Sequence, residues 1–371
     1  MKLATAILAR TRSSIGLDIG ATGVRAVQLV RTGNGFVVET AIAMAGSLSV
    51  GGSEKSAMDP RRLSQALARA GFRGTKAAAV LSMPDVTFHV LDLPPVALDQ
   101  CSATARQIVS SEVVRLTGMS GGEFQAVHWK LPPSQVSGPN AMAVCASRTV
   151  VGEILALCRS SGLHCFSVDA SPTALARFGA VLDRRPDGCV WGVLDVGERQ
   201  SRLTLVLEGV PVLVRAVGSG SQVWTQRIAK SFDLSPQAAE VHKRDGGISA
   251  AAAEGGLPGV DVPESKLPSL ILGAIRGELT DLAAQIKRSY EYVLGCHPDR
   301  RAGDLVLCGS GALLRNLAEF LASSLGISVR PASSYLGGAG CRLKLSSSCQ
   351  EPIERLGAAI GLLVEEDDAA G

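Results

Sequence analysis

The chain of 371 residues has little of three things: aromatic side chains (4%), net charge (+3 at pH 7) and long apolar runs. So small a charge does not indicate a nucleic-acid-binding surface. No apolar run approaches the ~18 residues that a membrane-spanning helix needs. The nine cysteines include no Cys-x-x-Cys pair, and the simplest setting for such scattered thiols is a reducing cytoplasm. We therefore expect a soluble cytoplasmic protein that does not bind nucleic acid.

The sequence is rich in aliphatic residues and glycine. Hydrophobic residues make up 46% of the chain and 41 residues are glycine, a profile typical of a turn-rich α/β protein. Strand-like and helix-like segments alternate, and the clearest helical period covers residues 270–294. The length predicts two or three domains.

One short pattern occurs twice. Residues 15–29 are IGLDIGATGVRAVQL and residues 192–206 are GVLDVGERQSRLTLV. Each has an apolar strand, an aspartate, one apolar residue, a glycine and a second strand-like run. The equivalent residues are Asp18 and Asp195, Gly20 and Gly197, and Arg25 and Arg202.

Such a hairpin suits phosphate chemistry. Gly20 permits a positive φ and lets backbone N–H groups approach an anion closely. A carboxylate such as Asp18 would repel a phosphate unless Mg²⁺ or its waters lay between them. A single Asp-x-Gly is ordinary turn chemistry, but two copies predict a clamp on both sides of a polyphosphate.

Other nucleotide-binding motifs are absent from the sequence. It contains no G-x-x-x-x-G-K-[ST] and no G-x-G-x-x-G between a strand and a helix. The remaining candidate is LCGSGALL (307–314), where Gly309 and Gly311 could lie against a flat adenosine group. Alone it is weak, because Gly-Ser-Gly is also a plain turn.

Together these segments resemble the actin-like ATPase superfamily. The two hairpins look like its phosphate motifs, 307–314 resembles its adenosine motif, and SPQAAEVHKRDGG (235–247) is similar to the helix that holds the nucleoside. The order of segments is most similar to the PilM-type proteins of type IV pilus assembly. The resemblance implies ATP and Mg²⁺ as cofactors, with Asp18 and Asp195 as catalytic and metal-binding residues. It implies as further cofactor-binding residues Gly20, Ala21, Thr22, Arg25, Gly197, Gly218, Gly220, Glu240, Lys243, Arg244, Gly309, Ser310 and Gly311.

The resemblance also implies a ribonuclease H-like, actin-like α/β fold of two lobes. The expected parts are a first lobe at 14–188 with an inserted small subdomain at about 83–168, a second lobe at 189–346 with a nucleoside-binding helical part at about 221–300, and a helix at 352–364 that returns to the first lobe.

Three positions depart from the family pattern. Arg25 replaces a lysine that is common there, and the second motif carries the bulky run GERQSR (197–202). Ser171 stands where the family often has a glutamate. If that position helps to orient a water, we expect weak ATPase activity or none.

The implied function is an ATP-binding cytoplasmic scaffold, peripheral at the inner membrane, that binds the cytoplasmic N-terminal peptide of a PilN-like membrane protein and other pilus assembly proteins. We expect the peptide groove between the first lobe and the insertion, near SMPDVTFHVLDLPP (82–95), with Val86, Phe88 and Val90 in contact. The same side chains could instead fill the core of the insertion.

Two other functions stay open. A small-molecule kinase of the same superfamily would need a catalytic aspartate, for which Asp85 and Asp169 are the candidates. The other is a cell-division or secretion membrane adaptor of the same fold. A C-terminal amphipathic membrane helix would favour the division protein, and the acidic EEDDAAG (365–371) argues against such a helix.

Overall fold

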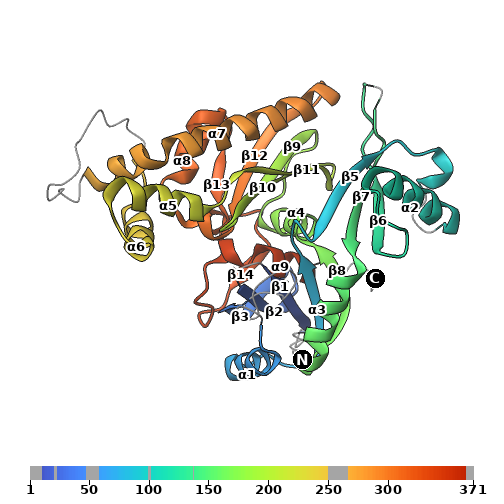
Figure 1. Ribbon diagram of the computed structural model, residues 1–371, viewed down its shortest axis with the longest axis horizontal. Helices are drawn as coiled ribbons and strands as arrows, with labels where there is room; N and C mark the ends of the chain where they lie inside the picture. Colours follow the sequence, from blue (N-terminus) through green and yellow to red (C-terminus); the bar gives the residue numbers. More distant parts are fainter. Residues whose placement is uncertain are drawn as a thin grey trace, which may run out of the picture.

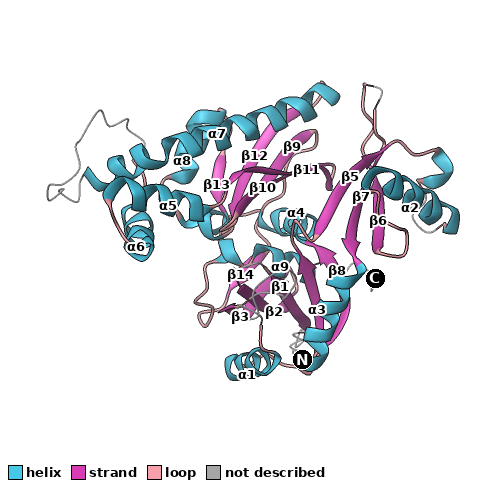
Figure 2. Cartoon of the chain, viewed as in Figure 1, coloured by secondary structure: helices cyan, strands magenta, loops and turns pink. Residues whose placement is uncertain are grey.

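The computed structural model describes residues 11–20, 23–46, 58–98, 102–136, 138–249 and 266–364. These residues form three β-sheets with helices packed around them (Figure 1, Figure 2). Ala21 and Thr22, predicted to bind the cofactor, lie outside the described residues. In the described ranges, no helix is both long and apolar enough to cross a membrane.

A six-stranded sheet forms the first lobe. Its strands, in order, are β14 (Leu343–Leu345), β3 (Gly35–Ala45), β2 (Gly23–Thr32), β1 (Arg12–Ile19), β4 (Lys76–Leu81) and β8 (His164–Ala170). Helices α1 (Pro60–Ala70) and α3 (Arg148–Ser160) cover one face and share its apolar core. The Asp59 side chain accepts a hydrogen bond from the first turn of α1, and Gly71 ends that helix with φ 85°, so local capping fixes its length.

A five-stranded sheet forms the second lobe. Its strands are β11 (Val210–Ser219), β10 (Gln200–Leu207), β9 (Cys189–Val196), β12 (Arg301–Cys308) and β13 (Val329–Pro331). On its outer face lie α5 (Ser221–Phe232), α6 (Pro236–Gly246), α7 (Leu267–Cys296) and α8 (Leu317–Leu325). The helical stripe predicted in the sequence is confirmed, because its members are all buried in α7: Ile275, Leu279, Leu282, Ile286, Tyr290 and Val293.

Two helices lie between the two large sheets. They are α4 (Ser171–Leu182) and α9 (Gly357–Leu363), and their core cluster includes buried residues of both sheets. The helices approach closely because α9 presents a glycine to α4: a Cβ on Gly361 would overlap the backbone of Ala174. The two hairpins therefore face a shared central layer.

A three-stranded sheet in the order β5 (Val86–Leu91), β7 (Ala141–Ser147) and β6 (Phe124–Lys130) packs with α2 (Ala103–Thr117). It lies at the right in Figure 1. Before α2, Pro94 and Pro95 hold the chain in a short 3₁₀ turn, Pro95–Ala97. The other short 3₁₀ segments are Ser310–Leu313, Ala332–Tyr335 and Ile353–Arg355.

Strand pairing refines the expected domain limits. Strand β8 pairs with β4 and is therefore part of the first sheet. Helix α3 packs in the core of the first lobe. Both were expected in the insertion at 83–168. Strand β14 pairs with β3 of the same sheet, although it falls in the range predicted for the second lobe. We propose an insertion at 84–147 and a second lobe that ends near residue 336.

The duplicated pattern forms the same unit in both lobes. Asp18 lies opposite Arg25 in the β1–β2 hairpin, and Asp195 lies opposite Arg202 in the β9–β10 hairpin. Each first strand has a parallel neighbour on its other side, β4 for β1 and β12 for β9. The repeat is thus a repeat of topology as well as of sequence.

Candidate functional site

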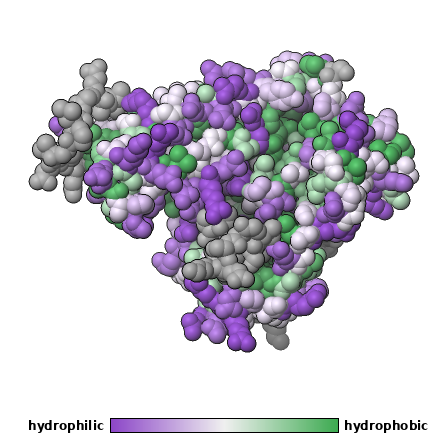
Figure 3. Space-filling model, in the orientation of Figure 1, coloured by the Kyte–Doolittle hydropathy of each residue, from purple (hydrophilic) through white to green (hydrophobic). Residues whose placement is uncertain are grey.

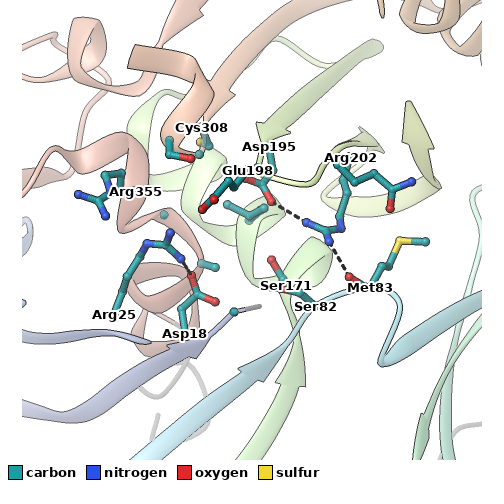
Figure 4. A pocket seen from close by; sticks show the side chains of 18 of the residues that line it. Asp18, Arg25, Ser82, Met83, Ser171, Asp195, Glu198, Arg202, Cys308 and Arg355 are labelled. Atoms are coloured by element: carbon teal, nitrogen blue, oxygen red, sulfur yellow. Dashed lines mark hydrogen bonds and ion pairs between the residues drawn. The ribbon is translucent and has the colours of Figure 1, made fainter. Parts of the chain in front are cut away.

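The ends of the two hairpins line one cleft between the lobes (Figure 4). Its cavity is about 110 Å³, below the roughly 300–1,000 Å³ of typical ligand pockets. Asp18 and Arg25 enter it from the first lobe, and Asp195 and Arg202 enter it from the second. A complete nucleotide would therefore need the cleft to widen.

The first hairpin carries a buried ion pair. Arg25 Nη1 lies 3.1 Å from Asp18 Oδ2. Burial raises the pKa of Asp18; Arg25 opposes that rise, and the nearby Asp195 adds to it. The buried carboxylate of Asp18 is therefore stabilised by an added cation, whether a metal ion or a proton.

The second hairpin carries a looser pair. Arg202 Nη1 lies 3.6 Å from Asp195 Oδ2, and Arg202 Nη2 donates a hydrogen bond to the Met83 carbonyl at 2.5 Å. Met83 precedes the small three-stranded sheet. Arg202 therefore ties the second lobe to the start of the insertion across the cleft (Figure 4).

Both arginines keep one polar atom unused. Nε of Arg25 and Nε of Arg202 are buried and have no hydrogen-bond partner. Buried donors are rarely left unpaired, because desolvation without a partner costs about 1–3 kcal/mol. Arg355 also lines the cavity and has a third buried Nε without a partner. Unpaired guanidinium nitrogens gathered beside one cavity fit an anion with several oxygens, such as a polyphosphate.

The carboxylates fit a metal ion only together with such an anion. No group of three or more His, Cys, Asp and Glu residues in the described ranges could hold a metal by itself. Mg²⁺ is usually held by one or two carboxylates together with phosphate oxygens and waters. Asp18 and Asp195 supply that number of carboxylates.

The glycines of the two motifs have different roles. Gly20 and Gly197 are not among the described glycines with positive φ, so neither uses the positive φ that glycine permits. Gly20 N–H instead donates to the Gly23 carbonyl at 2.9 Å, closing the turn. A Cβ on Gly197 would lie 2.7 Å from the Gln200 carbonyl, whereas one on Gly20 would meet nothing closer than 3.5 Å.

The Gly-Ser-Gly turn packs against the second hairpin. Gly309 has φ 85°, and a Cβ there would lie 2.5 Å from Asp195 Oδ1. A Cβ on Gly311 or on Gly220 would also overlap the second hairpin. These glycines, predicted as cofactor contacts, are therefore needed for close packing around Asp195.

The structure brings part of the predicted cofactor set together. The members that line the cleft are Asp18, Gly20, Arg25, Asp195, Gly197, Gly309 and Ser310. The described members that do not line it are Gly218, Gly220, Glu240, Lys243, Arg244 and Gly311. A nucleoside-binding role for this second group stays a prediction.

Lys243 is engaged inside the second lobe. Its Nζ lies 2.7 Å from Glu240 Oε2 and 2.8 Å from Thr225 Oγ1, and it also donates to the Ser221 carbonyl at 3.1 Å. Burial lowers the pKa of Lys243, and Glu240 opposes that shift. Arg244 is exposed and pairs with Asp245 at 3.4 Å. In this arrangement Lys243 joins α6 to α5 and is not free for a base or ribose.

Sequence reasoning left several cleft residues out of the site. Arg202 was visible in the repeat, since it is equivalent to Arg25. Glu354 gave no local signal: it lines the cleft from the segment before α9 and accepts a hydrogen bond from Ser333 N–H at 2.8 Å. Ser171 lines the cleft at the start of α4.

The two aspartates considered for a kinase differ. Asp85 lines the cleft, and burial raises its pKa while Arg202 lowers it. Asp169 lies outside the cleft, where it is held by Arg177 and accepts a hydrogen bond from Thr173 Oγ1 at 2.8 Å. Only Asp85 is placed to reach a ligand in the cleft.

The residues predicted to bind a partner line two different hollows. Val86 is buried and lines a hollow of about 120 Å³ between the first lobe and the insertion, with Val127 and Asp169. Phe88 and Val90 line a larger groove between the insertion and the second lobe. Phe88 also packs edge-on against Trp129, with ring centroids 6.3 Å apart.

No protein-family model and no curated protein matches the sequence. The fold, however, is found in solved structures. A chain of the PilM-PilN type IV pilus biogenesis complex matches with a TM-score of 0.68 and 23% identity, over 94% of this chain and 97% of that chain. The ethanolamine utilization protein EutJ from Carboxydothermus hydrogenoformans matches with a TM-score of 0.51 and 14% identity, over 96% and 90% of the two chains. The chain therefore has the actin-like α/β fold that the sequence predicted, in a form similar to that in the PilM-PilN complex.

Proposed function

We propose that the protein is an ATP-binding, actin-like scaffold of type IV pilus assembly, cytoplasmic and peripheral at the inner membrane. In this proposal it binds the cytoplasmic tail of a PilN-like membrane protein. The fold it shares with a chain of the PilM-PilN complex supports the pilus role. The nucleotide role has its main support in the cleft.

The observation that carries the nucleotide proposal is the pair of unused guanidinium nitrogens. Arg25 and Arg202 occupy equivalent positions in the two hairpins, and each has a buried Nε without a partner. In the proposal, both arginines bind phosphate oxygens, and Asp18 and Asp195 hold Mg²⁺ on the same phosphates. Mg²⁺ supplies positive charge that neutralises the phosphates and offsets the buried carboxylates.

The proposed turnover is slow. Ser171 lines the cleft at a position where PilM-type proteins often have a glutamate. In the proposal that position helps to orient a water, and a serine hydroxyl is a weaker base than a carboxylate. Outside the two hairpins, the carboxylates of Asp85 and Glu354 line the cleft. Glu354 already accepts a hydrogen bond from Ser333 N–H, which leaves Asp85, with Arg202 close by, as the candidate base. We propose that ATP mainly shifts the population of lobe arrangements.

The proposed place for the PilN-like tail is the hollow between the first lobe and the insertion. It is bordered by strands β4, β5 and β8 and by the exposed Val127 of β6. Val86 lies at its floor. Phe88 and Val90 remain predicted partner contacts, but they would reach a peptide only on the other side of the insertion.

Nucleotide binding is tested by thermal unfolding. ATP with Mg²⁺ at about 100 times its Kd stabilises a protein by about 2.7 kcal/mol, provided that the unfolded chain does not bind it. We expect the wild-type melting temperature to rise, and we expect Asp195→Ala to remove the rise while the protein stays folded.

The matched control is Asp245→Ala, because Asp245 is an exposed aspartate of α6 that does not line the cleft. It should keep the full shift. A wild-type melting temperature unchanged by millimolar ATP with Mg²⁺ would end the nucleotide proposal.

A further inference from the structure

A second groove lies on the other side of the insertion. Its volume is about 490 Å³, within the roughly 300–1,000 Å³ of sites that hold ligands. Its walls are the β5–β7 face, strand β11 and the C-terminal end of α7. Figure 3 shows apolar residues gathered on this side of the molecule, over the region where β5 and β11 approach each other in Figure 1. The exposed apolar side chains here include Val90 and Tyr292, which are 50% and 59% exposed.

The groove runs along an open strand edge. Strand β11 is the last strand of the five-stranded sheet and pairs only with β10 among the described strands. Four consecutive residues of β11, from Val212 to Arg215, line the groove. Consecutive strand residues point to opposite faces, so the groove lies beside the edge of β11 and not only above one face. The β11 edge thus offers N–H and C=O groups to another strand.

Fixed contacts at the two ends hold the groove open. Trp129 Nε1 donates to the Pro211 carbonyl at 2.9 Å, joining the insertion to the start of β11. At the far end, Ser134 Oγ and Gln135 N–H both donate to the Cys296 carbonyl at the end of α7, at 2.9 Å and 3.2 Å. The walls are therefore placed before any ligand binds, which reduces the entropy lost on binding.

The groove carries positive and no negative charge among the described residues that line it. Arg215 is exposed and lines the groove, and no described residue forms an ion pair with it. None of the described residues that line the groove is acidic. Burial lowers the pKa of His89, the neighbouring titratable group on β5. Among the described residues that line the groove, which also include His297, Arg215 is the one that is always charged.

We propose that this groove binds an extended peptide segment of a protein partner, as an added strand on the edge of β11. The segment alternates apolar residues, which pack on Val90, Met142 and Tyr292, with polar ones, and it places an Asp or Glu carboxylate against Arg215. Strand addition supplies affinity through main-chain hydrogen bonds, and the pockets for alternate side chains supply specificity. This site is separate from the hollow at Val86, and the inference does not depend on nucleotide binding.

The test uses a displayed library of random 12-residue peptides, selected on the full chain. The enriched peptides are synthesised, and their Kd values are measured by fluorescence anisotropy. We expect alternating apolar residues with at least one Asp or Glu. We expect Val90→Asp, a change at an exposed side chain, to weaken binding at least tenfold. Arg215→Gln should weaken it about fivefold and remove most of its salt dependence.

Two controls locate the peptide. Val127→Asp changes an exposed valine of the other hollow, 67% exposed, and should leave the Kd unchanged. N-methylation of alternate peptide residues should weaken binding in one register and not in the other, because only one edge of the added strand faces β11. The proposal is overturned if no sequence is enriched, if Val127→Asp and not Val90→Asp abolishes binding, or if N-methylation leaves the Kd unchanged in both registers.

Discussion

The two motif hairpins share one topology but hold their charged residues differently. In the first, Arg25 Nη1 lies 3.1 Å from Asp18 Oδ2, and both residues belong to the first lobe. In the second, Arg202 lies 3.6 Å from Asp195 and donates across the cleft to the Met83 carbonyl at 2.5 Å. The difference shows that two copies of one hairpin can have different structural roles. The first hairpin holds a buried carboxylate, and the second also links the lobes.

The largest expected effect is a difference in stability between alanine variants of the two turn glycines, Gly197 and Gly20. Gly197→Ala should destabilise the protein by about 1–3 kcal/mol, because a Cβ would lie 2.7 Å from the Gln200 carbonyl and the turn would have to move. Gly20→Ala should change the free energy of unfolding by less than about 0.5 kcal/mol, since its nearest contact would be 3.5 Å away. Urea unfolding of both variants checks this. Equal losses would mean that the two turns are under equal steric constraint.

The next effect concerns the buried carboxylate. Burial raises the pKa of Asp18 above its unfolded value. As the pH rises from about 4 through the folded pKa, the unfolded chain releases this proton first, so the Asp18 contribution to stability falls and stays low at neutral pH. Asp18→Asn should therefore raise the melting temperature at pH 7 by about 2 °C and remove this part of the pH dependence.

The equivalent change, Asp195→Asn, is the control for that experiment. It removes the ion pair of Arg202 but leaves the bond to Met83, and we expect no gain in melting temperature at pH 7. Thermal unfolding of both variants between pH 4 and pH 8 measures the contrast. A lower melting temperature for Asp18→Asn at every pH would show that the pair with Arg25 outweighs the cost of burial.

The smallest effect is local to the link between the lobes. Arg202→Gln should speed hydrogen exchange of the Asp85 amide about fivefold, which corresponds to a loss of about 1 kcal/mol in the free energy of local opening. The reason is that the turn from Ser82 to Asp85 loses the hydrogen bond that Arg202 donates to the Met83 carbonyl. Arg25→Gln should leave this amide unchanged. Exchange measured by mass spectrometry on peptides that span residues 82–86 decides between them. No change in either variant would mean that the link does not hold this turn.

The sequence predicted the fold well where pattern and structure are local. The repeat placed Asp18 and Asp195 at equivalent strand ends, and the four–three spacing from Ile275 to Val293 predicted α7. Periodicity could not show which strands pair over long distances. Strand β8 joins β4, and β14 joins β3, through contacts between segments far apart in the chain.

The candidate site was predictable in part for the same reason. Motif residues at strand ends reach the cleft, as Asp18 and Gly197 do. Glu354 reaches it only because α9 packs between the two sheets. Lys243 fits a nucleoside-binding spacing, but its amine is used within the second lobe by Glu240 and Thr225. Spacing in the sequence predicts which residues share a helix face. It does not predict which neighbouring side chains already bind those residues in the folded protein.

The position of α9 has a consequence for biosynthesis. Its residues fill the face of the first sheet that also holds α4, yet they are translated after the whole second lobe. At about 5–20 residues per second, synthesis of that lobe takes roughly ten seconds or more. During this interval the aliphatic face of the first sheet lacks the part of its cover that α9 provides, and β14 is missing from the edge of the sheet. A ribosome that stalls before Gly357 would therefore leave a nascent chain that is a substrate for chaperones and proteases.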